Sequence, residues 1–238
     1  MLRRPATGMM PVWLPERGPT NIGVKFAGNT ASMLPLVVKT RQKNRKSKMN
    51  IMLDIETLGR SCNAAVVSIG AVVFDPDTGL LADEFYRVID MEDALKYGLS
   101  DEETLEWWDS QREEAKAIFL PEAGAIEFEQ ALGEFSVWVM NMQLTHGGPA
   151  KMWSNGAGFD LVILRNGYAS ADLPCPWNFW NEFDVRTIVE LGRQKLGVNP
   201  KKDMPFDGTT HNALADAKHQ AGYVSVIWQM LGDKWVTY

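Results

Sequence analysis

The segment IMLDIETLGR, residues 51–60, ends a short apolar run with two acids. The run over residues 51–55 is too short for most helices and Gly59 follows it, so it predicts a central strand covered on both faces. Side chains alternate along a strand, so Asp54 and Glu56 share a face, a little under ~7 Å apart. Such carboxylates repel each other unless basic partners or a metal ion are present. For this motif taken alone, a surface turn with two solvated acids is the better interpretation.

The composition is that of one globular domain. The 238 residues are 45% hydrophobic and 23% charged, which leaves room for a sizeable core. No apolar stretch approaches the ~20 residues that cross a bilayer, so we expect no membrane association. Cys62 and Cys175 have no close spacing, which argues against a disulfide framework or a zinc site and fits a reducing cytoplasm. Because the chain has only three His, any metal would be held mainly by oxygen.

Charge divides the sequence near residue 48. Residues 1–48 hold ten of the 24 Lys and Arg and a single acid, Glu16, and so carry +9. The other 14 basic and 29 acidic residues give the remainder −15. Three interpretations of the first segment stay open: a basic arm for nucleic acid, a disordered leader, or sequence upstream of a true start at Met49. We favour the last two and predict that the folded domain spans 49–238.

The pattern after Met49 alternates between strands and helices. Three strands, the last two joined by a turn at 75–79, are expected to form a meander over 50–56, 65–75 and 81–89. The later elements expected are a helix opened by a capping box of Ser100 and Glu103, a short strand over 151–154, and helices over 125–142, 159–169, 183–197 and 212–231. Residues 198–210 are expected to form a loop. This succession predicts a mixed α/β sheet with helices on both faces.

Two later segments also carry acids. In MWSNGAGFDLVIL, residues 152–164, a strand runs into a glycine-containing turn, and Asp160 opens the next helix, where the helix dipole stabilises a carboxylate. In HNALADAKHQ, residues 211–220, Asp216 falls at the edge of an apolar helix stripe. On one helix His211 would point roughly 140° away from Asp216, so the two share a site only if His211 precedes the helix. Taken singly, Asp160 fits ordinary helix-start chemistry and His211 a surface cap.

Together the segments form a specific order: Asp-x-Glu on a strand, a glycine-preceded Asp, and His-x4-Asp opening a final helix. This order resembles the three exonuclease motifs of the DEDD superfamily, in the variant whose third motif carries a histidine. Further stretches look like phage and prophage 3′→5′ exonucleases of the exodeoxyribonuclease VIII-like type, a group also similar to a bacterial exoribonuclease type. These stretches are EWWDSQREEA (106–115), WSNGAGFD (153–160), PCPWNFWNEFDVRTIVELG (174–192) and HNALADAKHQAGYVSVIWQ (211–229). The likeness covers roughly 49–231.

The resemblance implies a ribonuclease H-like fold, a five-stranded mixed sheet flanked by helices on both faces. It implies a 3′→5′ exonuclease that releases nucleoside 5′-monophosphates from a nucleic acid 3′ end, with single-stranded DNA favoured over RNA. Two divalent ions, Mg²⁺ or Mn²⁺, would be bound by Asp54, Glu56, Asp160 and Asp216, and His211 would act as general base. The oligomeric state is left open, a homodimer included.

Contacts to the substrate are harder to predict from the sequence. The resemblance implies that Thr57 and Leu58 contact the terminal nucleotide, and Asn155 is a further candidate for substrate binding. Trp107 or Trp108 could stack on a base, although most of the nine tryptophans are expected in the core. A domain at −15 is a poor electrostatic match for nucleic acid. An enzyme that grips only a few terminal nucleotides nevertheless needs little positive surface.

Two classes of function remain: a 3′→5′ exonuclease on DNA or RNA, and a catalytically silent ribonuclease H-like accessory module. Silent members of such families usually lack one or more of the acids. All five chemical positions are intact here, which favours the enzyme. The motifs themselves do not separate DNA from RNA.

Overall fold

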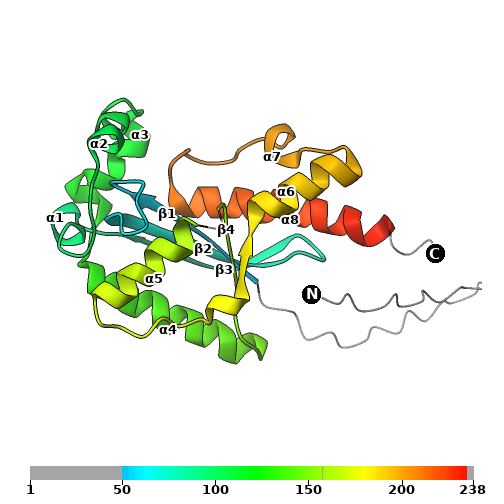
Figure 1. The fold of residues 1–238 in the computed structure, drawn as a ribbon, viewed down its shortest axis with the longest axis horizontal. Coiled ribbons are helices and arrows are strands. Elements are labelled where there is room, and N and C mark those ends of the chain that lie inside the picture. Colours follow the sequence, from blue (N-terminus) through cyan, green and yellow to red (C-terminus); the bar gives the residue numbers. More distant parts are fainter. Residues whose placement is uncertain (1–49, 157, 235–238) are drawn as a thin grey trace, which may run out of the picture. The chain divides into compact units, whose positions relative to one another are not determined.

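The computed structural model describes residues 50–156 and 158–234, and it folds them as one mixed sheet with helices on both faces (Figure 1). The basic segment 1–48 lies outside the described residues. The expectations of a leader, a basic arm or an unused start therefore stay predictions, as does the domain boundary at Met49.

The sheet has five strands in the order β3-β2-β1-β4-β5. The strands are β1 (Asn50–Thr57), β2 (Val66–Asp75), β3 (Leu80–Val88), β4 (Lys151–Ser154) and β5 (Glu182–Asp184). β1, β2 and β3 pair antiparallel, as the predicted meander requires. β4 adds parallel to the other side of β1, and β5 adds parallel to β4. The predicted five-stranded mixed sheet is confirmed.

The helices are α1 (Met91–Ala94), α2 (Glu102–Asp109), α3 (Glu113–Lys116), α4 (Phe128–His146), α5 (Asp160–Ser170), α6 (Val185–Leu191), α7 (Pro200–Asp203) and α8 (Ala213–Lys234). In Figure 1, α4 and α5 lie on one side of the sheet, and α6 and α8 lie on the other. No helix in the described part of the chain is long and apolar enough to cross a membrane.

The alternation along β1 decides which side chains meet which helices. Ile51, Leu53 and Ile55 belong to the core cluster that includes residues of α4 and α5. Met52 belongs to the second cluster, which is built on α8. Asp54 and Glu56 follow Met52 at even positions, so they face the α8 side of the sheet. The apolar run therefore supplies two cores, and its acids emerge under α8.

Three local predictions were wrong. Asp101, not Ser100, caps α2: its carboxylate accepts a 2.8 Å hydrogen bond from the Thr104 N–H and another of 2.8 Å from the Arg60 N–H. The helix predicted from residue 183 begins at Val185, because Glu182–Asp184 pair with β4 as the edge strand β5. The predicted loop 198–210 contains the single turn α7, which packs on α8. Three-residue strands and four-residue helices carry too little periodicity to be recognised in sequence.

Gly70 allows α8 to begin directly on the sheet. It pairs with Asp54 across the β1–β2 ladder. A Cβ placed on Gly70 would lie 2.2 Å from backbone atoms of Ala213 and Leu214, so no larger residue fits without moving the helix start. Ala213 and Ala217, one turn apart, are fully buried. Small side chains on both surfaces therefore bring the first turn of α8 against the strand that carries the acids.

The close approach can be tested by adding one methyl group. We expect Gly70→Ala to lower the free energy of unfolding by about 1–3 kcal/mol or more, because backbone atoms must move to admit it. Gly133→Ala is the matched control: Gly133 lies on the exposed side of α4 with nothing within 4 Å of the added Cβ. That change should stabilise the protein by about 0.5–1 kcal/mol. Denaturant unfolding of both variants measures the difference, and a Gly70→Ala protein as stable as the parent would contradict the contact.

Candidate active site

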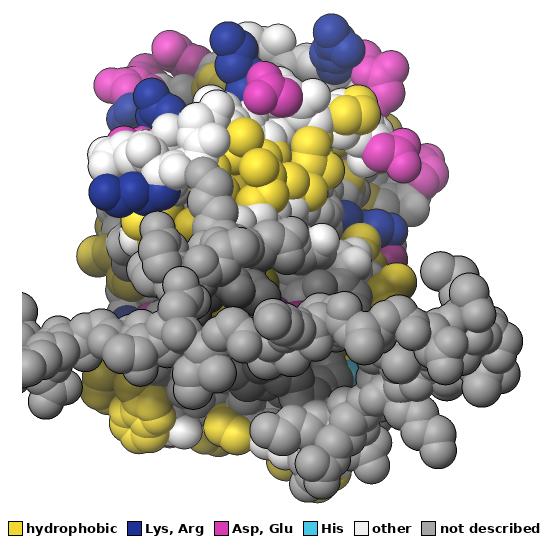
Figure 2. Space-filling view, turned by 90° about the vertical axis from the view of Figure 1, so that its right-hand side faces the viewer, with side chains coloured by type: hydrophobic (Ala, Val, Ile, Leu, Met, Phe, Trp, Pro, Cys, Tyr) yellow, Lys and Arg dark blue, Asp and Glu magenta, His cyan; other side chains and the backbone are white. Residues whose placement is uncertain are grey.

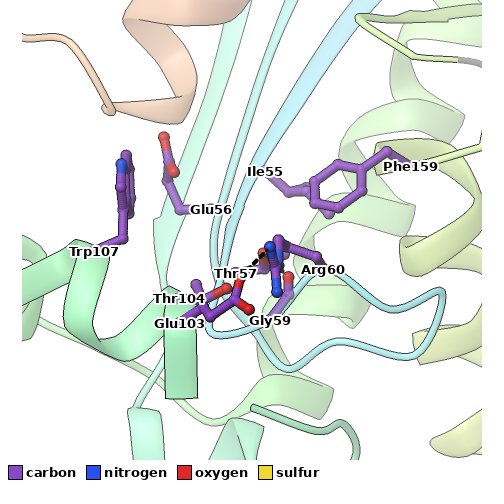
Figure 3. Close-up of a pocket in the computed structure, with 9 residues that line it drawn as sticks. All are labelled: Ile55, Glu56, Thr57, Gly59, Arg60, Glu103, Thr104, Trp107 and Phe159. Atoms are coloured by element: carbon purple, nitrogen blue, oxygen red, sulfur yellow. Dashed lines mark hydrogen bonds and ion pairs between the residues drawn. The ribbon is translucent and has the colours of Figure 1, made fainter. Parts of the chain in front are cut away.

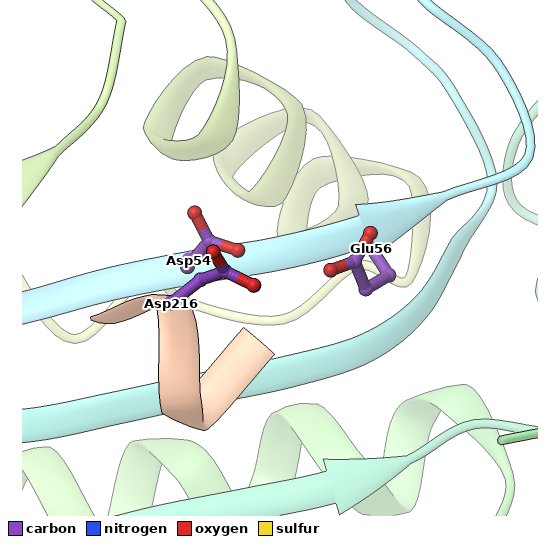
Figure 4. Close-up of side chains that lie close together, drawn as sticks. All are labelled: Asp54, Glu56 and Asp216. Atoms are coloured by element: carbon purple, nitrogen blue, oxygen red, sulfur yellow. The ribbon is translucent and has the colours of Figure 1, made fainter. Parts of the chain in front are cut away.

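Three carboxylates from β1 and α8 converge on one point (Figure 4). Asp54, Glu56 and Asp216 each offer an oxygen, and these oxygens all lie within 4.8 Å of one another. Glu56 is buried, with 8% of its surface exposed. Carboxylates this close are the oxygen-rich arrangement that a divalent cation requires.

The start of α8 fixes Asp216 in this cluster. The Asn212 side chain accepts a 3.0 Å hydrogen bond from the Ala215 N–H, an N-cap contact that sets where the helix begins. Asp216 follows in the first turn. His211 lies before the helix with a φ of 62°, an uncommon conformation for a residue other than glycine. The prediction that His211 precedes the helix is confirmed.

Asp160 lies beside the three clustered acids rather than among them. It is the first residue of α5 and is 4% exposed. Burial raises its pKa to about 6, while the backbone N–H groups of Asp160 and Ile55, the charge of Arg186 and the Ser154 hydroxyl act in the opposite direction. The Ile55 contact holds Asp160 next to β1, and its charge raises the pKa values of Asp54 and Glu56.

The pKa values of the clustered acids record how unfavourable their charges are without a cation. Burial raises the pKa of Glu56 to about 8, and the charges of Asp216 and Asp160 add to the shift. Burial also raises the pKa of Asp54 well above its ordinary value, followed by repulsion from Asp160, Glu56 and Asp216. Burial raises that of Asp216, although His211 lowers it through its charge and its backbone N–H. Near neutral pH the metal-free cluster therefore retains protons.

The cluster contains an unpaired buried oxygen that a divalent metal would satisfy. Oδ2 of Asp216 is buried and has no hydrogen-bond partner among the described residues. The Asp54 carboxylate accepts a 2.7 Å hydrogen bond from the Gln220 side-chain amide. A buried carboxylate oxygen with no donor is costly, and a cation would satisfy it. The residues present are thus suited to hold Mg²⁺ or Mn²⁺.

Gln220 is a site residue that the sequence did not reveal. It is buried, and it lies four residues after Asp216 on α8, so both side chains emerge on the same side of the helix. A polar residue at that spacing within an apolar stripe is the signal that could have pointed to it.

A pocket of about 420 Å³ opens beside Glu56 (Figure 3). Trp107 and Phe159 supply aromatic rings to its lining, and Arg60 lies in it with Glu103, to which it forms a 2.6 Å ion pair. The Trp107 ring contacts the His211 ring edge to face, with 4.7 Å between centroids. Glu56 therefore belongs both to the acid cluster and to the lining of this pocket, and His211 lies against Trp107 of the lining.

Two of the predicted substrate contacts belong to the core. Trp108 is 3% exposed, and its indole N–H donates a 2.9 Å hydrogen bond to the Thr57 carbonyl. The Leu58 side chain is 1% exposed, and its backbone N–H and C=O bond to Ala65 and Asp101. Neither side chain offers a surface to a nucleotide. Trp107, at 39% exposed, is the tryptophan of the pair that does.

Thr57 and Asn155 line two different pockets. Thr57 lines the pocket beside Glu56, where its hydroxyl donates a 2.7 Å hydrogen bond to the Gly59 carbonyl. Asn155 follows β4 and lines a second pocket with Arg186, and its amide oxygen is buried without a partner among the described residues.

Comparison with known proteins identifies the family. A model described as the 3′–5′ exoribonuclease Rv2179c-like domain matches residues 49–228. The chain belongs to this family. It is a 3′→5′ exonuclease and hence a phosphodiester hydrolase, as the resemblance implied. Among curated proteins, the exodeoxyribonuclease of Enterobacteria phage T4 is 25% identical over 191 residues, covering 70% of this chain and 83% of the phage protein.

Solved structures of other exonucleases share the fold. One describes 3′-end-specific recognition of a histone mRNA stem-loop by a 3′-exonuclease; it is 15% identical, with a TM-score of 0.53 over 79% of this chain and 83% of the other. Another is cell-death related nuclease 4, which is 14% identical, with a TM-score of 0.57 over 79% of this chain and 64% of the other. These neighbours confirm the predicted ribonuclease H-like fold.

The repulsion within the cluster predicts a pH-dependent stability. A raised carboxyl pKa means that the folded state keeps a proton that the unfolded chain loses, so metal-free stability falls as pH rises from about 4 to about 8, the raised pKa of Glu56. Asp216→Asn removes one of the repelling charges. We therefore expect its metal-free melting temperature to exceed the parent's at pH 8 and to match it near pH 4.

The control for this experiment is Asp83→Asn, which removes an exposed β3 acid outside the cluster. It should leave the melting temperature unchanged at both pH values. If thermal melts without metal showed Asp216→Asn no more stable than this control at pH 8, the repulsion would be refuted. Adding Mg²⁺ at pH 8 should stabilise the parent more than Asp216→Asn, since a ligand that binds only the folded state stabilises it.

Proposed function

We propose that this exonuclease removes nucleotides one at a time from the 3′ end of single-stranded nucleic acid, with DNA as the preferred substrate. The observation that carries the proposal is the convergence of Asp54, Glu56 and Asp216 next to His211 and an open pocket. Hydrolysis of a phosphodiester needs a water molecule to lose a proton and the phosphate charge to be neutralised. The acids and His211 are suited to these tasks.

The acids would hold the divalent ions. Asp54, Glu56 and Asp216 would bind one ion, and Asp160, beside them, would act on a second with Asp54. Two bound ions supply a lowered water pKa and a counter-charge for the phosphate and the leaving 3′ oxygen. The contribution of the chain would be to hold four acids in a repelling arrangement that bound cations relieve.

His211 would accept the proton of the attacking water. Histidine is the side chain whose ordinary pKa lies closest to neutral pH, and the imidazole can hold a proton and then release it to solvent. Its ring is half-buried and packs edge to face against Trp107, an exposed residue of the pocket beside Glu56. This contact holds the ring in place. Because the ring is not among the clustered ligands, it is free to act as a base.

The pocket beside Glu56 would receive the terminal nucleotide. Trp107 and Phe159 are the aromatic side chains of its lining, and a base can stack on such rings whatever its identity. Thr57 and Gly59 line the same pocket, next to the acids. Stacking supplies affinity that an acidic surface cannot, which fits a domain of net charge −15.

The preference for DNA rests on the likeness to the phage T4 exodeoxyribonuclease. The alternative, a 3′→5′ exoribonuclease, is favoured by the description of the family model. Digestion of 3′- and 5′-labelled single-stranded DNA, duplex DNA and RNA in Mg²⁺ and Mn²⁺ separates these substrates. We expect single nucleoside 5′-monophosphates from the 3′ end of single-stranded DNA. Faster digestion of RNA than of DNA would show that RNA is the preferred substrate. Binding of these nucleic acids without cleavage would indicate an accessory module.

The role of His211 has a specific kinetic signature. His211→Ala should lower the rate roughly 10²–10⁴-fold, the usual contribution of a general base. Affinity for Mg²⁺ should hardly change, because the ring is not a metal ligand. The rate of the parent should rise with pH as the imidazole loses its proton. In the variant this rise should flatten, and higher pH should recover part of the rate, since solvent hydroxide can replace the missing base.

His146→Ala is the control, since His146 ends α4 and lies outside the cluster and the pocket beside Glu56. It should keep the parental rate and pH profile. A His211→Ala protein of near-parental rate would exclude the base. Full recovery of the variant by excess Mg²⁺ would instead make His211 part of the metal site.

A further inference from the structure

A second pocket, of about 490 Å³, is lined by basic side chains. Its lining consists of Asn155, Arg186, Val189, Glu190, Arg193, Asn199, Lys201 and Lys202. Four cations and one acid meet there, in a region after residue 48 that carries a net −15. Because acids outnumber bases in this region, a pocket in which cations outnumber acids is unexpected from its composition.

The cations of this pocket are mostly without acidic partners. Outside this pocket, the described residues form seven ion pairs between an Arg or Lys and an Asp or Glu, such as Arg87 with Glu134 and Lys218 with Glu84. Arg193 is paired with Glu190 at 3.0 Å. Arg186, Lys201 and Lys202 have no ion pair within 4.0 Å among residues 50–156 and 158–234. Unpaired cations around a hollow are suited to bind phosphate.

Two amides in the pocket also lack partners. The Oδ1 atoms of Asn155 and Asn199 are buried without a hydrogen bond among the described residues. An amide oxygen accepts hydrogen bonds, so it suits a hydroxyl or amino group rather than a phosphate oxygen. A nucleotide unit carries a phosphate together with such donors.

The pocket borders the acid cluster through Arg186. The Arg186 charge lowers the pKa of Asp160, and its guanidinium lies 3.3 Å from where a Cβ of Gly156 would be. Asn155 immediately precedes that glycine. On the other side the pocket reaches α7, which carries Lys201 and Lys202. Figure 2 shows Lys and Arg side chains, with Asp and Glu side chains among them, over the upper part of the face that it presents.

We propose that this basic pocket, which runs from Asn155 and Arg186 to Lys201 and Lys202, binds a phosphate-bearing nucleotide of the substrate strand on the 5′ side of the scissile bond. The proposal rests on the exonuclease function proposed above. The terminal nucleotide occupies the aromatic pocket beside Glu56, the scissile phosphate lies at the acids, and the strand continues past Arg186 towards α7. This would place a local positive surface where the strand leaves the site, within a region after residue 48 that is acidic as a whole.

The test is the double variant Lys201→Ala/Lys202→Ala, compared on substrates of different length. The p-nitrophenyl ester of thymidine 5′-monophosphate occupies only the catalytic centre, so its hydrolysis should be unchanged. For a single-stranded DNA 12-mer, KM should rise roughly tenfold with kcat unchanged. The double variant should also bind a fluorescent 12-mer in EDTA with a weaker dependence on salt. The slope of log affinity against log salt concentration should become shallower by ~0.7 for each phosphate contact removed.

Two further variants separate contact from net charge. Arg112→Ala/Lys116→Ala removes the same charge at α3, which lies to the left of α7 in Figure 1 and outside the lining of the basic pocket, and should behave as the parent. Lys201→Arg/Lys202→Arg keeps the charge and should restore the parental KM. Equal KM and salt slope in the parent and the Lys201→Ala/Lys202→Ala protein would overturn the proposal.

Dinucleotides with and without a 5′-phosphate identify the source of the phosphate. If the 5′-phosphate raises kcat/KM for the dinucleotide in the parent but not in the double variant, a terminal phosphate lies in the pocket. Dependence on chain length alone would place an internal phosphodiester there. If the parent hydrolyses neither the nucleoside ester nor any oligonucleotide, the proposed exonuclease function fails. Binding of the fluorescent 12-mer in EDTA still decides whether the pocket binds the strand.

Discussion

The mutual repulsion of four acids is the constraint around which this molecule is organised. Asp54, Glu56 and Asp216 offer oxygens that all lie within 4.8 Å of one another, and Asp160 lies beside them. Burial strengthens the repulsion because it removes the water that would screen it. The cluster therefore destabilises the metal-free fold near neutral pH, and the rest of the structure must hold it together. Affinity for a divalent ion is the direct consequence.

The fold holds the acids by close packing on both sides of β1. The odd residues of the strand fill the core beneath α4 and α5, which leaves its acids under α8. Gly70 on the sheet and the buried alanines of α8 have small side chains, so the helix can pack directly against the sheet. Parallel pairing of β4 with β1 then brings the start of α5, and with it Asp160, to the same place. Glu56 of this centre lines the aromatic pocket, and Arg186, whose charge lowers the pKa of Asp160, lines the basic pocket.

The sequence predicted the parts of this arrangement that carry a period or a motif. The buried run 51–55 predicts the central strand, and the order of acids resembles that of a known family. It could not predict contacts that depend on distant packing, such as the hydrogen bond from Gln220 to Asp54 or the burial of Trp108 against Thr57. Adjacent tryptophans on a helix point in different directions, and only the tertiary structure shows which one faces the pocket. The strand β5 was missed because three residues show no alternation.

The most direct test of the central claim is the number of protons released when Mn²⁺ binds. Calorimetric titration at pH 7 in two buffers of different ionisation enthalpy measures this number. Because the pKa of Glu56 is raised to about 8 and that of Asp54 is raised well above its ordinary value, we expect about one proton or more to leave for each protein molecule saturated. Glu56→Gln should release fewer. Saturable Mn²⁺ binding without proton release, in the parent and in Glu56→Gln alike, would show that the acids are already ionised and contradict the repulsive cluster.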